Sequence, residues 1–200
     1  MITSTSNQQM KNLMLLMKKA KARNEQELFV VEGRKMFQEV PEEWLKQVYV
    51  SESFFAENDK MLAGYTYEIV SDSVFKAVSD TQTPQGILCL VRKPQYRLEE
   101  LLKGADTHLL ILESIQDPGN LGTMLRTGEG AGITGILMSP GTVDLFSPKV
   151  VRSTMGSIYR VPFFEASDWE AALRQVKAAG VRLYAAHLRG TGSYDSFDYT

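Results

Sequence analysis

Apolar residues in the first 93 positions alternate between helical and extended spacing. Residues 8–22 carry Met10, Leu13 and Leu16 on one face, which predicts an amphipathic helix. Further helices are predicted after Gly33 and from Ser71. Short apolar runs predict strands at residues 28–31, 48–50, 67–70 and 86–91. This alternation predicts a compact α/β unit over residues 1–93.

The apolar pattern then breaks and resumes in a different form. Residues 94–105 contain a short helical stretch from Leu98 to Leu102 and read as a linker. The run Leu109–Leu112 is apolar at every position, which is typical of a strand buried on both faces in a parallel sheet. We therefore predict an α/β fold with two parts: a small domain, residues 1–93, and a parallel-sheet domain, residues 106–200.

Alternating elements are predicted through most of the second part. Asp117-Pro-Gly-Asn120 predicts a turn, followed by a helix from about Leu121. Ser147-Pro148 predicts a helix start with a capping serine, and Ser167 with Glu170 predicts a capping box. The remaining strands are predicted at 135–138, 161–164 and 181–187, with no element in 188–200.

A glycine cluster at residues 128–132 invites comparison with a dinucleotide-binding fingerprint. That fingerprint needs its glycines after a strand and before a helix. Here the glycines follow a predicted helix and are expected to end it. The sequence therefore argues against a nicotinamide-type cofactor site, and a nucleotide-binding α/β protein is the weakest of the functional hypotheses.

The amino-acid composition limits the kinds of protein that this sequence can encode. Of 200 residues, 44% are hydrophobic and 23% charged, which is ordinary for a globular protein. One cysteine, Cys89, and two histidines make a metal site improbable, so none is predicted. No apolar run is long enough for a membrane span, and the N-terminus lacks the order of a signal peptide. We predict a cytoplasmic protein without membrane contact.

Net charge is −2, yet the N-terminal segment is locally basic. Residues 1–24 contain Lys11, Lys18, Lys19, Lys21 and Arg23 and no acidic residue. Such a cluster can bind phosphate groups. A solvated helix face explains the same pattern, and the sequence leaves both interpretations open.

Two polar side chains stand out where the strand at 109–112 gives way to a helix. Asn120 and Arg126 lie six residues apart, close to the carboxyl end of that strand. Ligands of open α/β sheets bind at this end of the strands. The two residues are candidates for a shared site, while a capping asparagine and a solvated arginine remain the plain alternative.

Three segments together resemble one family. Asp117-Pro-Gly-Asn-Leu-Gly122 with Arg126, then Phe146-Ser-Pro-Lys149 through Gly156, and Val161-Pro162 are similar to the SpoU/TrmH family. Its members are S-adenosylmethionine-dependent RNA ribose 2'-O-methyltransferases with the knotted SPOUT fold. Phe29-Val-Val-Glu-Gly33 and Thr81–Gly86 resemble the ribosomal-protein-like substrate-binding domain that many rRNA-modifying members carry.

The resemblance also shows a departure. The family continues with a Gly-x-Glu-x-x-Gly loop and a Ser-Leu-Asn-containing segment, and neither occurs in these 200 residues. Those segments thread the trefoil knot and supply most of the cofactor pocket. We therefore expect a fragment or a truncated member, with the main cofactor-binding loops beyond Thr200 and weak or no cofactor binding by the residues given.

The resemblance implies roles for particular residues. Arg126 and Asn120 are the expected catalytic pair, with Gly119 and Gly122 permitting close approach. Arg126 serves either as a proton acceptor or, more simply because a guanidinium is a poor base, as a donor that binds a phosphate and stabilises the alkoxide.

The expected substrate is RNA, with ribosomal RNA favoured over transfer RNA, and the expected assembly is a homodimer. Lys149 and Arg152 are expected at the RNA or at the dimer partner, or else are surface charges. Lys18, Lys19, Lys21 and Arg23 are expected to bind RNA. The alternative function is a non-catalytic RNA-binding protein built on a degraded methyltransferase.

Overall fold

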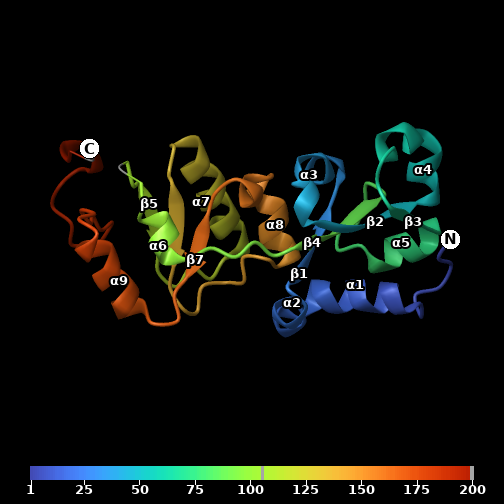
Figure 1. Ribbon diagram of the computed structural model, residues 1–200, viewed down its shortest axis with the longest axis horizontal. Coiled ribbons are helices and arrows are strands. Elements are labelled where there is room, and N and C mark those ends of the chain that lie inside the picture. The colour runs from blue at the N-terminus through green and yellow to red at the C-terminus, as the bar shows by residue number, and fades with distance from the viewer. Residues whose placement is uncertain (105, 199–200) are drawn as a thin grey trace.

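The computed structural model describes residues 1–104 and 106–198. Ala105, in the predicted linker, and Tyr199 and Thr200, at the end of the predicted second domain, lie outside the described residues. The molecule is elongated, with two sheets side by side along its long axis and the N- and C-terminal ends at opposite extremes (Figure 1). Among the described residues, no helix combines the length and the apolar character needed to cross a membrane.

The first sheet has four strands in the order β1-β4-β2-β3. These are β1 (Leu28–Glu32), β2 (Leu45–Ser51), β3 (Tyr67–Val70) and β4 (Ile87–Arg92). β4 pairs antiparallel with both β1 and β2, while β2 and β3 run parallel. All four predicted strands are confirmed, and Cys89 is buried in β4 as expected.

Helices cover this sheet on both sides. They are α1 (Gln8–Lys18), α2 (Ala20–Gln26), α3 (Arg34–Glu39), α4 (Glu52–Asn58) and α5 (Asp72–Val78), with single turns η1 (Glu42–Trp44) and η2 (Asp59–Leu62). α1 buries Met10, Leu13 and Leu16 against the sheet, the face that their spacing predicts. α6 (Leu98–Leu101) then connects to the second sheet.

The single helix predicted over residues 8–22 is wrong in one respect, because the chain breaks it at Lys19. Lys19 has extended backbone angles, and two helices meet there. The break turns Arg23 back toward α1, where Nη1 donates to the carbonyl oxygens of Leu16, at 2.5 Å, and Met17, at 3.2 Å. Carbonyls of a last helical turn have no partner within the helix, so an arginine donor replaces the missing bonds.

The second sheet is parallel throughout, as predicted, with the order β5-β6-β7. Its elements are β5 (Leu109–Leu112), α7 (Pro118–Gly130), β6 (Gly135–Met138), α8 (Pro148–Thr154), η3 (Ser157–Tyr159), β7 (Phe163–Glu165) and α9 (Trp169–Ala178). The last turn, η4, is Tyr194–Ser196. The glycines at 128–132 end α7, which confirms their predicted role.

The strand predicted at 181–187 is wrong: the structure has no regular element between Val181 and His187. Leu183 and Tyr184 remain 39% and 42% exposed. Since a strand is stabilised by pairing, its apolar pattern alone does not form one without a neighbour. β5 forms the edge of the described sheet, and three of its four residues are only partly buried, in contrast to the predicted full burial.

Two predicted caps also differ. Asp168, and not Ser167, caps α9, because its carboxylate accepts from the Ala171 N–H at 2.9 Å. Pro148 does begin α8, but the Ser147 hydroxyl makes no capping hydrogen bond.

The two sheets share one continuous core. Phe29 of β1 packs against Phe146, which precedes α8, with ring centroids 4.9 Å apart. The Tyr159 hydroxyl donates to the Met36 carbonyl at 3.2 Å. The two units are therefore joined by packed apolar surface as well as by the chain between them.

Candidate functional site

Asn120 and Arg126 both lie on α7, which begins earlier than the sequence suggested. Asp117 caps the helix, since its Oδ1 accepts from the Asn120 N–H at 2.7 Å, and Pro118 occupies the first turn. Asn120 is therefore helical and not part of a loop. Both side chains are exposed. Six residues of helix separate them by about 9 Å along the axis and about 120° around it, so they bracket the exposed face of α7.

The loops after β5 and β6 are fastened to each other beside this helix. Ser114 has a positive φ of 54°, and its N–H donates to the buried Ser139 hydroxyl at 2.8 Å. Gln116 donates to the Gly141 carbonyl at 2.5 Å. A non-glycine residue held in this conformation is uncommon and concentrates at functional loops. The carboxyl edge of the sheet is thus a preorganised surface next to the start of α7.

Gly122 serves packing between helices. A Cβ at this position would lie 1.8 Å from the Ser153 Oγ of α8, a distance that no real side chain tolerates. Ser153 in turn donates to the Pro118 carbonyl at 3.2 Å. The close approach that Gly122 permits within the protein is therefore to α8; a Cβ at Gly119 would meet Asp117 Oδ1 at 3.1 Å.

The back of α7 is held by an ion-pair network. Arg160 donates to Glu129, near the end of α7, and through Nη1 to Glu39 of α3 at 2.6 Å. The Arg160 guanidinium, as hydrogen-bond donor, lowers the pKa of Glu129 below its ordinary value. The helix that carries Asn120 and Arg126 is thus attached to the first unit through one arginine.

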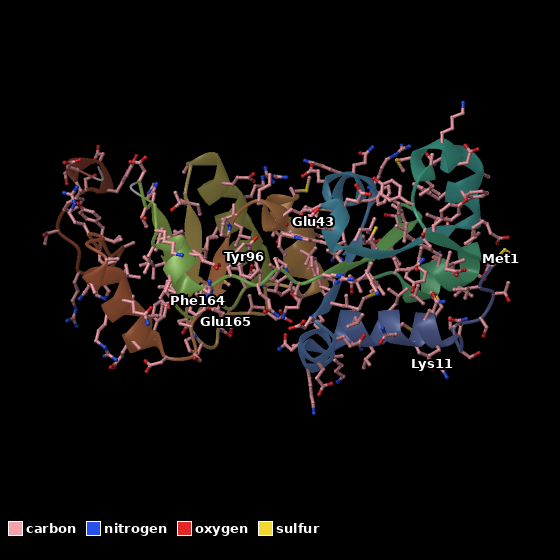
Figure 2. The ribbon with its side chains drawn as sticks, viewed as in Figure 1. Met1, Lys11, Glu43, Tyr96, Phe164 and Glu165 are labelled. Carbon is pink, nitrogen blue, oxygen red and sulfur yellow. The ribbon has the colours of Figure 1, made fainter. Side chains whose placement is uncertain are left out.

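The predicted RNA-binding residues fall into two groups. Lys18, Lys19, Lys21 and Lys149 are exposed, as contact with RNA requires. Figure 2 shows Lys11, near the same cluster, pointing away from the sheet.

Arg23 departs from the prediction. Its side chain is only 5% exposed, and Nη2 forms an ion pair with Asp144 at 2.5 Å. A guanidinium enclosed in this way joins α2 to the second unit and does not present its charge to RNA. The sequence pattern gave no sign of this, because its acidic partner lies 121 residues away.

Arg152 is also engaged. Its Nη1 lies 2.6 Å from Asp80 Oδ2, on the loop before β4, and both side chains are partly exposed. Glu32 orders that loop by accepting from the hydroxyls of Ser79, at 2.5 Å, and Thr81. Arg152 is therefore available to RNA only if the Asp80 pair opens.

Asn120 and Arg126 lie on the open surface of the described chain. Neither residue lines any of four cavities of the described chain, those bordered by Lys93, Leu101, Arg92 and Leu145. The two buried hydroxyls without a partner in this unit, Thr142 and Ser147, lie beyond β6 and not on α7. We accordingly assign no described residue to hold a cofactor. No group of histidine, cysteine or acidic residues in the described ranges is arranged to bind a metal.

Comparison with known proteins decides the family. Residues 107–200 match the SpoU rRNA Methylase family, and residues 7–89 match the MRM3-like substrate binding domain. The 23S rRNA (guanosine(2553)-2'-O)-methyltransferase RlmP of Bacillus subtilis is 31% identical over 195 residues, which cover 96% of this chain and 75% of RlmP. This chain belongs to the SpoU rRNA methylase family.

Other members of the SpoU family resemble the chain over different shares of their length. Human mitochondrial rRNA methyltransferase 3 is 34% identical over 172 residues, which cover 80% of this chain and 40% of the human protein. The crystal structure of an rRNA methyltransferase from Sinorhizobium meliloti superposes with a TM-score of 0.85 at 30% identity, covering 99% of this chain and 76% of that one. A second structure of the Sinorhizobium enzyme, 29% identical, contains AdoMet. The α/β fold of the SpoU methyltransferases is thus confirmed.

Proposed function

We propose that this protein catalyses the S-adenosylmethionine-dependent methylation of a ribose 2'-hydroxyl in ribosomal RNA. The observation that carries the proposal is the pair Asn120 and Arg126, exposed on the first and third turns of α7 in a chain of the SpoU family. Named relatives that act on rRNA, RlmP and rRNA methyltransferase 3, support the substrate class. The AdoMet-bound Sinorhizobium structure supports the methyl donor.

Arg126 is proposed to stabilise the reacting oxygen. A ribose hydroxyl is a weak nucleophile, and its attack on a methyl group is helped by any group that stabilises the developing negative charge. A guanidinium does this while its remaining donors grip a neighbouring phosphate in a forked geometry. A guanidinium group stays protonated in proteins in general, which favours this role over that of a proton acceptor.

Asn120 is proposed to orient the ribose or Arg126. Its backbone N–H is occupied by Asp117, and this bond fixes the residue at the start of α7. The side-chain amide remains able to donate and accept toward a ligand. In this mechanism, Asn120 positions the ribose or Arg126, and Arg126 stabilises the negative charge that develops on the reacting oxygen.

RNA is proposed to reach this site across the exposed lysines. Lys18, Lys19 and Lys21 line the junction of α1 and α2, and Lys149 lies on the first turn of α8. Contacts of this kind bind phosphates without reading sequence, so they hold the RNA while other groups select the target.

The assembly and location are part of the same proposal. We propose a homodimer in the cytoplasm, with α8 near the partner subunit. Lys149 is exposed, and Arg152 forms an ion pair with Asp80. Both positions on α8 are compatible with a contact either to RNA or to the partner subunit. Light scattering after size exclusion gives the mass in solution and distinguishes a dimer from a monomer.

The alternative function is RNA binding without catalysis. It is favoured by the exposure of Lys18, Lys19 and Lys21, which supports RNA binding without requiring a cofactor. An RNA-binding protein of this kind would retain affinity for rRNA and transfer no methyl group.

The proposal is tested by mapping ribose methylation with mass spectrometry in rRNA and tRNA from cells with and without the gene. We expect one 2'-O-methyl group in rRNA to disappear with the gene and to return when the gene is restored. Identical methylation maps would contradict the enzymatic proposal and favour the alternative.

A further inference from the structure

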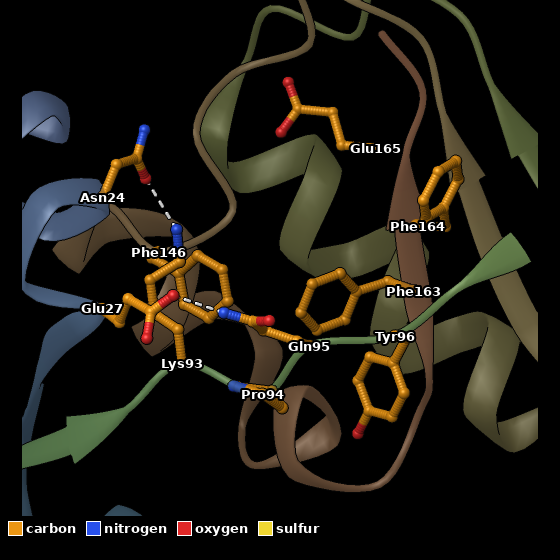
Figure 3. A pocket seen from close by; sticks show the side chains of 10 residues that line it. All are labelled: Asn24, Glu27, Lys93, Pro94, Gln95, Tyr96, Phe146, Phe163, Phe164 and Glu165. Atoms are coloured by element: carbon orange, nitrogen blue, oxygen red, sulfur yellow. Dashed lines mark hydrogen bonds between the residues drawn. The ribbon is translucent and has the colours of Figure 1, made fainter.

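Two adjoining cavities lie where the first unit meets the carboxyl edge of the parallel sheet. Their volumes are about 330 and 200 Å³, and the larger reaches the lower end of the range for small-ligand sites, about 300–1,000 Å³. Both cavities are lined by the same five residues: Asn24, Lys93, Phe146, Phe163 and Glu165. We call this space the junction pocket (Figure 3). The residues come from α2, the end of the first unit just after β4, the loop before α8, and β7.

Aromatic rings form one side of the junction pocket. The Phe146 and Phe163 centroids lie 5.5 Å apart, and Tyr96 meets Phe163 edge-on at 5.3 Å. Figure 3 shows these rings grouped around the linker, with the polar groups beyond them. Planar bases stack on such rings, which is how proteins hold unpaired nucleotides. Phe146 and Phe163 are buried and Tyr96 is partly exposed, so Tyr96 offers the ring on which a flat heterocycle would stack.

The polar side presents one strong donor and one strong acceptor. The Lys93 ammonium donates to Asn24 Oδ1 at 2.6 Å and lies 4.6 Å from the Phe146 centroid. Its other two N–H bonds have no partner among the described residues. The Glu165 carboxylate has neither a hydrogen bond nor an ion pair within the described chain. Burial lowers the pKa of Lys93 and raises that of Glu165; Lys93 is half-buried, whereas Glu165 is an exposed residue.

The charge of the lining argues against an anion. The larger cavity has one cation, Lys93, and two carboxylates, Glu27 and Glu165. A phosphate would face net repulsion there, whereas a neutral ring with adjacent acceptor and donor atoms would pair with both Lys93 and Glu165.

The surroundings of the pocket suit a nucleic acid. Ala20 and Asn24 of α2 line the pocket, while Lys18, Lys19 and Lys21 are exposed on the same segment of chain. Lysines of this kind bind the phosphate backbone. A strand held on the lysines would bring a base directly to the pocket rim.

We propose that the junction pocket, formed by Phe163 and Tyr96 together with Lys93 and Glu165, binds an unpaired guanine base of the RNA; this rests on the RNA-binding part of the proposed function. Guanine presents its O6 acceptor beside the N1–H and N2–H donors. Lys93 donates to O6, and Glu165 accepts from N1–H and N2–H. Adenine presents the opposite pattern, a donor at N6 and an acceptor at N1. Its N6 donor would face the Lys93 donor, and its N1 acceptor would face the Glu165 acceptor, so neither hydrogen bond would form.

The test uses fluorescein-labelled hexaribonucleotides, UUGUUU, UUAUUU and an inosine version, with anisotropy as the readout. One bidentate contact supports discrimination of about 10-fold or more, so we expect the guanine oligonucleotide to bind about 10-fold more tightly than the adenine one. Inosine lacks the N2 amine, and we expect its affinity to lie between the two.

Variants then assign the preference to the pocket. Glu165→Ala and Lys93→Met should each remove most of the difference between guanine and adenine. The matched changes Glu170→Ala and Lys103→Met, at exposed sites outside the pocket, should leave it intact. Circular dichroism of each variant confirms that the fold is retained.

The outcomes separate the two proposals. Equal affinity for all three oligonucleotides, or an unchanged guanine preference in both pocket variants, overturns the guanine pocket and leaves the methyltransferase proposal standing. Absence of binding by every oligonucleotide contradicts RNA binding itself, and therefore overturns the pocket as well.

Discussion

At the residue scale, exposure separates side chains that the sequence groups together. Lys18, Lys19 and Lys21 are exposed, whereas Arg23 is buried against Asp144. An exposed lysine is free to exchange its counterions for RNA phosphates, and a buried, paired arginine is not. The three lysines therefore form the proposed RNA-binding patch, whereas Arg23 links the two units through its ion pair with Asp144.

Replacing Lys18, Lys19 and Lys21 with Gln should weaken RNA binding and reduce its dependence on salt. If all three contact phosphates, the slope of log K against log salt should fall by about two to three. Binding titrations across a salt series measure that slope. The triple variant of Lys46, Lys60 and Lys76, also exposed, is the matched control. An unchanged slope in the first variant would mean that the patch is only a solvated face.

The residues of the candidate site were predictable to an unequal degree. Asn120 and Arg126 stand out as polar side chains in a short segment of sequence, and the structure places both exposed on α7. The burial of Arg23 and the Arg152–Asp80 pair could not be predicted, since each partner is more than 70 residues away in the chain. Spacing along the sequence carries no signal for such contacts. The assignment of catalytic roles stays a prediction.

At the element scale, α7 depends on its contact with α8. Gly122→Ala should destabilise the protein by about 1–3 kcal/mol, the usual cost of overpacking, because the new Cβ would overlap Ser153. Gly130→Ala, on the same helix, meets nothing within 4 Å and should be neutral or slightly stabilising. Urea unfolding of both variants measures the difference. Equal stability would show that the two helices are not in close contact.

The Arg160 network should make stability depend on pH in the acid range. The pKa of Glu129 is lowered mainly because Arg160 donates to it, relative to an ordinary value of 4.5. Its contribution is therefore complete above about pH 4.5 and is lost as pH falls through the lower, folded-state pKa. We expect Glu129→Gln to cost about 1 kcal/mol at pH 7 and less at pH 3.

Urea midpoints at the two pH values test the pair. Glu170→Gln, at an exposed position of α9, is the control for removing a carboxylate. A constant difference between Glu129→Gln and the parent at both pH values would contradict the assigned role of Glu129.

Elements with local signals were predicted well, and those that need a partner were not. The apolar runs of β4, β5 and β6 gave their strands, and Pro148 marked the start of α8. The start of α7 was placed too late, because Asp117-Pro118 reads equally as a turn and as a capped helix. Residues 181–187 have the pattern of a strand but no pairing neighbour, so no strand forms in the described chain.

At the scale of the whole molecule, the two units share a core and should unfold together. The core joins Phe29 and Val31 of the first sheet with Phe146 and Val151 beside the second. Buried apolar contact makes the stability of each unit depend on the other. We predict a single unfolding transition for both units.

Single-tryptophan variants test this prediction. Trp169→Phe leaves Trp44, which reports on the first unit, and Trp44→Phe leaves Trp169, which reports on α9. After correction for the stability of each variant by circular dichroism, both fluorescence signals should give the same urea midpoint. Two separate midpoints within one variant would show that the units are independent.

The central claim is that Arg126 supports methyl transfer to an RNA ribose. The most direct measurement is the transfer of a labelled methyl group from S-adenosylmethionine to rRNA, by the parent and by Arg126→Ala, with Arg174→Ala as an exposed control. Loss of a charged transition-state contact should reduce the rate by about 100-fold or more, while RNA affinity changes little. Equal rates for Arg126→Ala and an active parent would contradict the account.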